Sequence, residues 1–188
     1  MSQHNLPQAA PEWQVDAWFN TPVPLSLAAL RGKVVVVEAF QMLCPGCVAH
    51  GLPQAQRVHQ AFPRDQVAVV GLHTVFEHHA AMTPVSLQAF LHEYRIGFPV
   101  GVDRPGKDSP IPQTMQAYRM RGTPTLILID AQGRLREQHF GQVDDLVLGA
   151  EIATLVAEAA ADAARRRLSD PPAGAAGCEH GRCEIGAA

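Results

Sequence analysis

The stretch Val34–Phe40 constrains the fold of this chain more than any other. Its seven residues are apolar except for Glu38, and such a strand is typical of the centre of a sheet that is covered on both faces. A second apolar run, Val67–His73, has the same character. Helical patterns follow these runs, over about 45–61 and 86–95. We therefore expect strands and helices to alternate through the first part of the chain.

The second half of the chain predicts a hairpin and a long final helix. Residues 125–130 form an apolar run, 131–133 (Ala-Gln-Gly) are typical of a turn, and 135–140 follow as a partner strand. An amphipathic pattern then extends over 144–167, with Asp144 or Asp145 as its cap. The expected fold is therefore α/β, with a central mixed sheet flanked by helices on both faces.

Length and composition predict one domain with two appendages. A chain of 188 residues buries roughly 70% of its extended-chain surface on folding, so it needs no disulfide to hold it together. We expect a disordered N-terminus at 1–11 and a domain at 12–167. Residues 168–188 should form a mobile tail, because their composition changes to Pro, Gly and Ala.

Charge and hydropathy give no reason to expect nucleic acid or a membrane as partner. The net charge is −3, and a basic patch is what would attract either polyanion. The sequence has no run near the ~20 apolar residues that span a bilayer. The first residues are polar and lack the apolar segment of a signal peptide. These features predict a cytoplasmic protein.

Two cysteines, in the order Cys44-Pro45-Gly46-Cys47, lie between the first buried strand and its helix. In that setting a Cys-x-x-Cys indicates redox chemistry rather than a structural bridge. Cys44 precedes the first helical turn, where unpaired N–H groups stabilise a thiolate, so it is the expected nucleophile. Cys47 should be more buried and resolve the intermediate. Pro45 suits the first helical position, and Gly46 leaves room for a substrate backbone.

Glu38 and Thr123-Pro124 complete the predicted site. A carboxylate in a buried strand is unfavourable unless it has a partner or a function, so Glu38 is a candidate acceptor for the proton of Cys47. The alternative is a side chain that points outward at a strand edge. Pro124 precedes a buried strand and is a plausible cis proline. Packed against Cys44, it would leave the backbone of Thr123 free to pair with an extended substrate.

Together these residues resemble the thioredoxin-fold thiol:disulfide oxidoreductases, in the TlpA-like and ResA-like branch of the redoxin (AhpC/TSA-like) group. The resemblance implies reversible dithiol–disulfide exchange through a mixed disulfide on Cys44, resolved by Cys47. It implies protein disulfides or dithiols as substrates, a reductase or oxidase as partner, and no metal or cofactor beyond the Cys44–Cys47 disulfide. The chain departs from the family at Leu43, where thioredoxins usually have Trp, and at His50, where the branch usually has Glu.

A second cysteine pair, Cys178 and Cys183, lies in the C-terminal tail. Three interpretations remain open. The tail dithiol could relay electrons between Cys44–Cys47 and an external partner. It could hold a soft metal ion together with His180. It could also be an incidental pair of exposed thiols.

Two other functions compete with disulfide exchange. A peroxidase of the peroxiredoxin type normally has Thr three residues before the reactive cysteine and Pro before that, where this chain has Gln41 and Val37. A thiol-based metal-binding protein would use Cys44, Cys47 and nearby imidazoles. The candidate imidazoles are His50, His73, His78 and His79.

Overall fold

The computed structural model of the chain describes residues 8–169, and within them a six-stranded mixed sheet forms the centre of the molecule. The strand order is β1-β4-β3-β2-β5-β6. The strands are β1 (Val15–Phe19), β2 (Val34–Phe40), β3 (Val67–His73), β4 (Val100–Asp103), β5 (Thr125–Ile129) and β6 (Leu135–Phe140).

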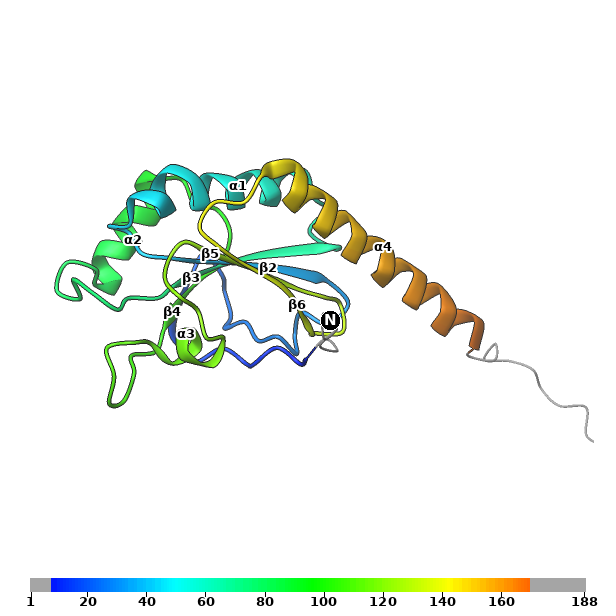
Figure 1. Cartoon of the computed structure of the whole chain (residues 1–188), viewed down its shortest axis with the longest axis horizontal. Helices are drawn as coiled ribbons and strands as arrows, with labels where there is room; N and C mark the ends of the chain where they lie inside the picture. Colours follow the sequence, from blue (N-terminus) through cyan, green and yellow to red (C-terminus); the bar gives the residue numbers. More distant parts are fainter. Residues whose placement is uncertain (1–7, 170–188) are drawn as a thin grey trace, which may run out of the picture.

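Helices cover both faces of this sheet, as Figure 1 shows. The helical elements are η1, a π-helical turn (Cys47–Gly51), α1 (Leu52–Ala61), α2 (Pro84–Glu93), α3 (Gln113–Ala117) and α4 (Asp145–Ser169). α1, α2 and α4 lie on one face, and α3 lies on the other with the segment that precedes β2. The predicted α/β class with a covered mixed sheet is confirmed. Within residues 8–169, none of the helices combines the length and hydropathy that a membrane crossing requires.

β2 is the central strand that its composition predicts. It pairs in parallel with β3 and antiparallel with β5, and all seven of its residues are buried. Side chains alternate along a strand, so Val34, Val36 and Phe40 join the core under α1, α2 and α4. Val35 and Val37 join the core on the α3 face. By the same alternation, Glu38 points toward the layer that contains α1.

The hairpin and the final helix follow the sequence prediction closely. The turn between β5 and β6 places Gly133 at φ +73°, a conformation that glycine adopts readily. Asp144 caps α4, because its side chain accepts a hydrogen bond of 2.8 Å from the Leu146 N–H. Asp145 instead accepts hydrogen bonds from Gln54 and Arg57 on α1. Of the two candidate caps, the structure selects Asp144.

The ends of the domain differ from the prediction. Ala9 forms a bridge with Arg134, and the Ala10 N–H donates to Gly133 O at 2.9 Å. The expected disorder is therefore wrong for residues 8–11, whose backbone pairs with the β5–β6 hairpin, whereas residues 1–7 lie outside the described part. At the other end, α4 continues through Leu168 and Ser169, two residues past the predicted boundary.

Asp103 joins β4 to α3 from a buried position, and its removal should destabilise the fold. Its carboxylate accepts hydrogen bonds from the backbone N–H groups of Thr114 and Met115, at 2.8 and 3.0 Å, and from the Thr74 hydroxyl at 3.0 Å. Asp103→Ala leaves these buried donors without an acceptor. We therefore expect a loss of about 2–3 kcal/mol in unfolding free energy, measured by urea denaturation. Asp103→Asn keeps an acceptor and should lose less. An unchanged midpoint for Asp103→Ala would refute this role.

Candidate active site

The two thiols lie where the central strand ends and its helix begins. β2 ends at Phe40, and the chain then turns with the Cys44 N–H donating to Gln41 O at 3.2 Å. The helix starts directly after Cys44. This region opens at the carboxyl end of the parallel pair β2–β3, which is where α/β sheets commonly bind their ligands. It lies at the left of Figure 1.

Cys44 has the surroundings of an attacking sulfur. Its side chain is half-buried, and Sγ accepts the Cys47 backbone N–H at 3.2 Å. An N–H from the first helical turn stabilises a thiolate by both its hydrogen bond and the helix dipole. In the thiol form, Cys44 donates to the Thr123 carbonyl at 3.5 Å. Both Cys44 and Cys47 are free thiols in this structure.

Cys47 has the opposite character, because it is fully buried. Burial, and after it the adjacent Cys44 sulfur, raises the pKa of the Cys47 thiol well above its usual range. Cys47 therefore keeps its proton at neutral pH. Such a thiol becomes a nucleophile only when a neighbouring group accepts that proton.

The Glu38 carboxyl lies inside the protein, against the helix that carries the thiols. Its Oε1 is buried without a hydrogen-bond partner among the described residues. Burial first, and then the charge of a Cys44 thiolate, raises the pKa of Glu38 well above its ordinary value of 4.5. A Cβ atom placed on Gly51 would lie 2.1 Å from Oε1. Glu38 thus points inward from a central strand, and the alternative of an outward side chain at a strand edge is wrong.

Pro124 packs over the same helix from the start of β5. The Thr123–Pro124 peptide bond is cis. A Cβ atom on Gly46 would lie 3.2 Å from Cδ of Pro124, and one on Gly51 would lie 3.1 Å from its Cβ. The two glycines therefore allow the ring to approach the helix closely. Pro45 is exposed and Thr123 is half-buried. By the contacts described above, the predicted site residues 38, 44–47 and 123–124 lie together in one place.

The active-site helix itself differs from the prediction. The sequence predicts one helix over about 45–61, but residues Cys47–Gly51 form a π-helical turn in which the Leu52 N–H donates to Cys47 O. Pro53 has no N–H to continue the α-helical pattern, and single π turns often occur at functional sites. Sequence reasoning did not identify Gly51 as part of the site. A glycine two residues before a proline inside a helix was the available signal.

In the part of the chain that the structure describes, the histidines form no metal-binding cluster with the thiols. His73 is buried against the Phe40 ring, with 5.3 Å between ring centroids, and burial lowers its pKa to about 4. His50, His78 and His79 are exposed. Among the described residues, three groups placed to hold a metal ion meet between β6 and α4, and they are Glu137, His139 and Glu151. There His139 Nε2 and Glu151 Oε2 are 2.8 Å apart, so a hydrogen bond already accounts for their proximity.

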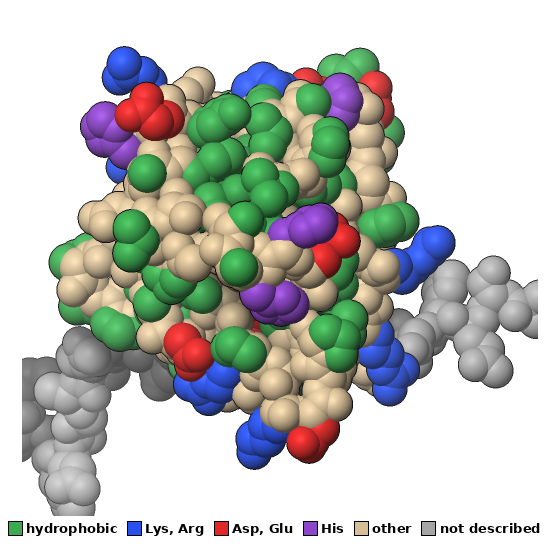
Figure 2. All heavy atoms as spheres, turned by 90° about the vertical axis from the view of Figure 1, so that its left-hand side faces the viewer, with side chains coloured by type: hydrophobic (Ala, Val, Ile, Leu, Met, Phe, Trp, Pro, Cys, Tyr) green, Lys and Arg blue, Asp and Glu red, His purple; other side chains and the backbone are tan. Residues whose placement is uncertain are grey.

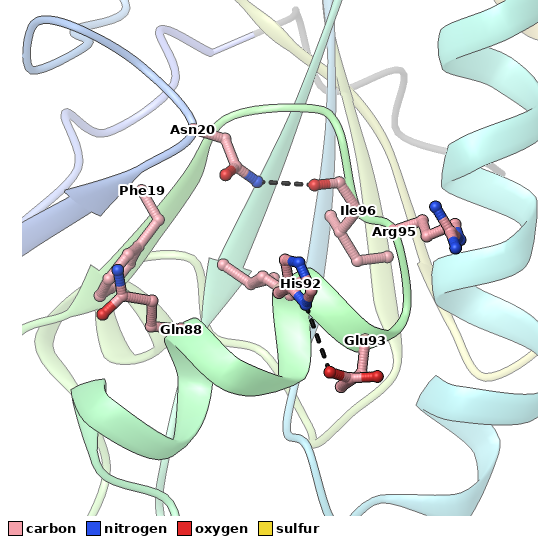
Figure 3. A pocket seen from close by; sticks show the side chains of 8 residues that line it. Phe19, Asn20, Gln88, His92, Glu93, Arg95 and Ile96 are labelled. Atoms are coloured by element: carbon pink, nitrogen blue, oxygen red, sulfur yellow. Dashed lines mark hydrogen bonds and ion pairs between the residues drawn. The ribbon is translucent and has the colours of Figure 1, made fainter.

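The side of the molecule that carries the thiols presents exposed apolar side chains, among them Leu43. Figure 2 views this side of the molecule and shows hydrophobic side chains gathered on it, with histidines beside them. A cavity of about 640 Å³ lies elsewhere, between the end of β1 and the last turn of α2, where Asn20 donates to Ile96 O at 2.7 Å (Figure 3). Its lining includes none of the predicted site residues. The thiols therefore suit a substrate that docks on a surface. Cys178 and Cys183 lie outside the described residues.

Comparison with known proteins agrees with this architecture. The model of the AhpC/TSA family matches residues 6–138. A crystal structure of a thioredoxin-like superfamily protein is 68% identical in sequence, with a TM-score of 0.78 over 79% of this chain and 96% of that chain. A thiol-disulfide isomerase from Corynebacterium glutamicum is 54% identical, with a TM-score of 0.75 over 78% of this chain and 96% of that chain.

Curated relatives match at lower identity. Protein DipZ of Mycobacterium tuberculosis is 31% identical over 132 residues, which are 69% of this chain and 18% of DipZ. The thiol-disulfide oxidoreductase ResA of Halalkalibacterium halodurans is 25% identical over 117 residues, which are 62% of this chain and 59% of ResA. The chain thus spans less than two thirds of the length of either relative. Because the family model covers most of the chain and its fold is thioredoxin-like, the protein belongs to the AhpC/TSA family, in its TlpA/ResA-like branch.

Proposed function

We propose that this protein is a thiol-disulfide oxidoreductase that exchanges electrons with protein disulfides through Cys44 and Cys47. The observation that carries the proposal is the contrast between the two sulfurs. One is accessible and receives a helix N–H at 3.2 Å, whereas the other is buried and keeps its proton. The names of the C. glutamicum isomerase and of ResA describe the same kind of chemistry.

In the first step, the Cys44 thiolate attacks one sulfur of a substrate disulfide. A bond forms between Cys44 Sγ and that sulfur while the substrate S–S bond breaks. The other substrate sulfur leaves as a thiolate and takes a proton from solvent. The Cys47 N–H, which points at Cys44 Sγ, stabilises the attacking thiolate before the step.

In the second step, Cys47 gives up its proton and attacks Cys44 Sγ. The Cys44–Cys47 disulfide forms, the mixed disulfide breaks, and the second substrate sulfur leaves. Glu38 accepts the proton in its ionised form, which its raised pKa makes less populated at neutral pH but a far stronger base than an exposed carboxylate. The second substrate sulfur leaves as a thiolate and takes a proton from solvent, so overall the dithiol gives the substrate two electrons and the protons pass through solvent and Glu38. A reductase or oxidase partner resets the pair, and the reverse sequence oxidises a substrate dithiol.

Substrate binding is assigned to the surface around Cys44. The Leu43 side chain is 57% exposed directly beside the nucleophile, and the half-buried backbone of Thr123 borders the same surface. An extended polypeptide with apolar side chains fits such a surface better than a small polar molecule does. We also propose that the protein is located in the cytoplasm.

The position of Gln41 argues against the peroxidase alternative. Its Oε1 accepts the Phe76 N–H at 3.2 Å, and its side chain is buried. That amide is therefore engaged with the loop after β3, whereas a peroxide-binding hydroxyl in this position would have to face Cys44.

Stoichiometry under single-turnover conditions tests the proposal. We expect the reduced protein to reduce one equivalent of an oxidised peptide disulfide, such as oxidised glutathione or insulin. Mass spectrometry after alkylation should then show a Cys44–Cys47 disulfide. Thiol titration and metal analysis of the protein purified under reducing conditions serve as controls. Stoichiometric metal together with unreduced insulin would overturn the proposal in favour of metal binding.

A further inference from the structure

We propose that Gly51 is a positioning residue for the proton transfer from Cys47, because its missing side chain leaves the slot in which the Glu38 carboxyl lies. The inference rests on the proposed function, since it concerns the second step of disulfide exchange. It adds a residue outside the Cys-x-x-Cys motif and gives the π-helical turn a role in the site.

The slot is defined by close contacts on two sides. A Cβ atom on Gly51 would lie 2.1 Å from Glu38 Oε1 and 3.0 Å from the carboxyl carbon. Real Cβ atoms do not approach other heavy atoms this closely, so any larger residue at 51 must displace the carboxyl. Pro124 closes the slot on another side, since its Cβ would be 3.1 Å from the same added atom. The displaced carboxyl would therefore have little space nearby.

The helix geometry brings this slot next to Cys47. Residues four apart in a helix lie on the same face one turn from each other, and Gly51 is four residues after Cys47. The π-helical turn joins the same two positions, because the Leu52 N–H that follows Gly51 donates to Cys47 O. A carboxyl pressed against Gly51 is thus held beside the turn that carries the buried thiol.

The backbone does not require glycine at this position. Gly51 has φ −59° and ψ −57°, a right-handed helical conformation open to every residue except proline. Alanine is a better helix former than glycine, so local helix stability alone favours a side chain here. The close approach of the Glu38 carboxyl is the feature of the structure that opposes a side chain at position 51.

Reaction with a chromogenic disulfide, 5,5′-dithiobis(2-nitrobenzoate), separates the two chemical steps. Cys44 attacks first and releases one thionitrobenzoate, and Cys47 then displaces the second from the mixed disulfide. For Gly51→Ala we expect the first release to keep its rate within about twofold. The second should slow about tenfold at pH 7, because the displaced Glu38 accepts the proton less well. Across a series of pH values, its rate should also lose the dependence on Glu38 ionisation that we expect of the wild type.

A double-substitution cycle identifies the group through which Gly51 acts. Glu38→Gln should slow the second release by a similar factor, and adding Gly51→Ala to it should slow the release no further. Gly149→Ala is the matched control, because Gly149 is a helical glycine in α4 with no atom within 4 Å of an added Cβ. If Gly51→Ala folds poorly, a double variant with Glu38→Asp and Gly51→Ala restores the space in the slot. Its second thionitrobenzoate should be released at the rate of Glu38→Asp alone.

The outcomes separate this inference from the proposed function. An equal slowing by Gly51→Ala with and without Glu38→Gln would show that Gly51 acts on the helix itself, which overturns the inference. An unchanged second release in Gly51→Ala, or in Glu38→Gln alone, would overturn it as well. In each of these cases the wild type still releases two equivalents through Cys44 and Cys47. If the wild type releases only one, the proposed function fails.

Discussion

Cys44→Ser should lower the rate of disulfide exchange by about 10³-fold or more, since among residues 8–169 it removes the accessible sulfur of the site. Cys47→Ser should instead allow the first step and stop the second. The reason is that Cys44 keeps its helix N–H in that variant, whereas no buried thiol remains to displace the substrate. A peptide disulfide mixed with Cys47→Ser should therefore accumulate as a covalent adduct, seen as a mass increase that a reductant reverses.

The two variants control for each other, because each removes one sulfur from the same turn. Their urea midpoints, measured in the reduced state, establish that both are folded. An adduct on Cys44→Ser, attached through Cys47, would contradict the assignment of the nucleophile. The same experiment with hydrogen peroxide tests the competing function, since peroxide turnover that survives Cys47→Ser but not Cys44→Ser would favour a peroxidase.

Glu38→Gln should stabilise the reduced protein at neutral pH, by an amount that grows with pH. Glutamine has nearly the same shape and no charge. Burial holds the pKa of Glu38 in the folded chain above its ordinary value of 4.5. Below pH 4.5 both states bind the proton, so the charge makes no difference. Above it the unfolded chain loses the proton and the folded chain keeps it, which destabilises the wild type by about 1.4 kcal/mol per pH unit up to the folded-state pKa.

Urea denaturation at pH 4, 5, 6 and 7 measures this difference directly. Expected are similar unfolding free energies for the two proteins at pH 4, and a rising advantage of Glu38→Gln toward pH 7. Glu93→Gln is a suitable control, because the Glu93 side chain is 77% exposed. A constant difference between wild type and Glu38→Gln at all four pH values would mean that Glu38 titrates alike in the folded and unfolded chains.

The sequence was sufficient to predict the central strands and the mixed character of the sheet because its signals were local and strong. The uninterrupted apolar residues of β2 left no face for solvent, and the turn at 131–133 fixed the partner of β5. The residues of the site were equally accessible to prediction, since Cys44, Cys47 and Thr123-Pro124 stand next to element boundaries. Glu38 was visible as one carboxylate in a run of valines.

What could not be predicted depends on contacts between distant segments. Residues 8–11 belong to a terminus that the sequence predicts to be disordered, and backbone pairing with residues 133–135 orders them. The π-helical turn was missed because Pro53 indicates a disturbed helix without indicating how the hydrogen bonds rearrange. Gly51 has no chemical group of its own, so its importance emerges only when the position of Glu38 is known.

The antiparallel pairing of β5 with β2 has a consequence for how this protein can be assayed. It brings the Thr123 carbonyl to Cys44, although the two residues are 79 positions apart in the chain. Before the sheet is formed, Cys44 and Cys47 are ordinary neighbouring thiols with similar reactivity. Once it is formed, Cys44 is half-buried and Cys47 is fully buried. The ratio of their alkylation rates is therefore a built-in reporter of whether the central sheet is intact.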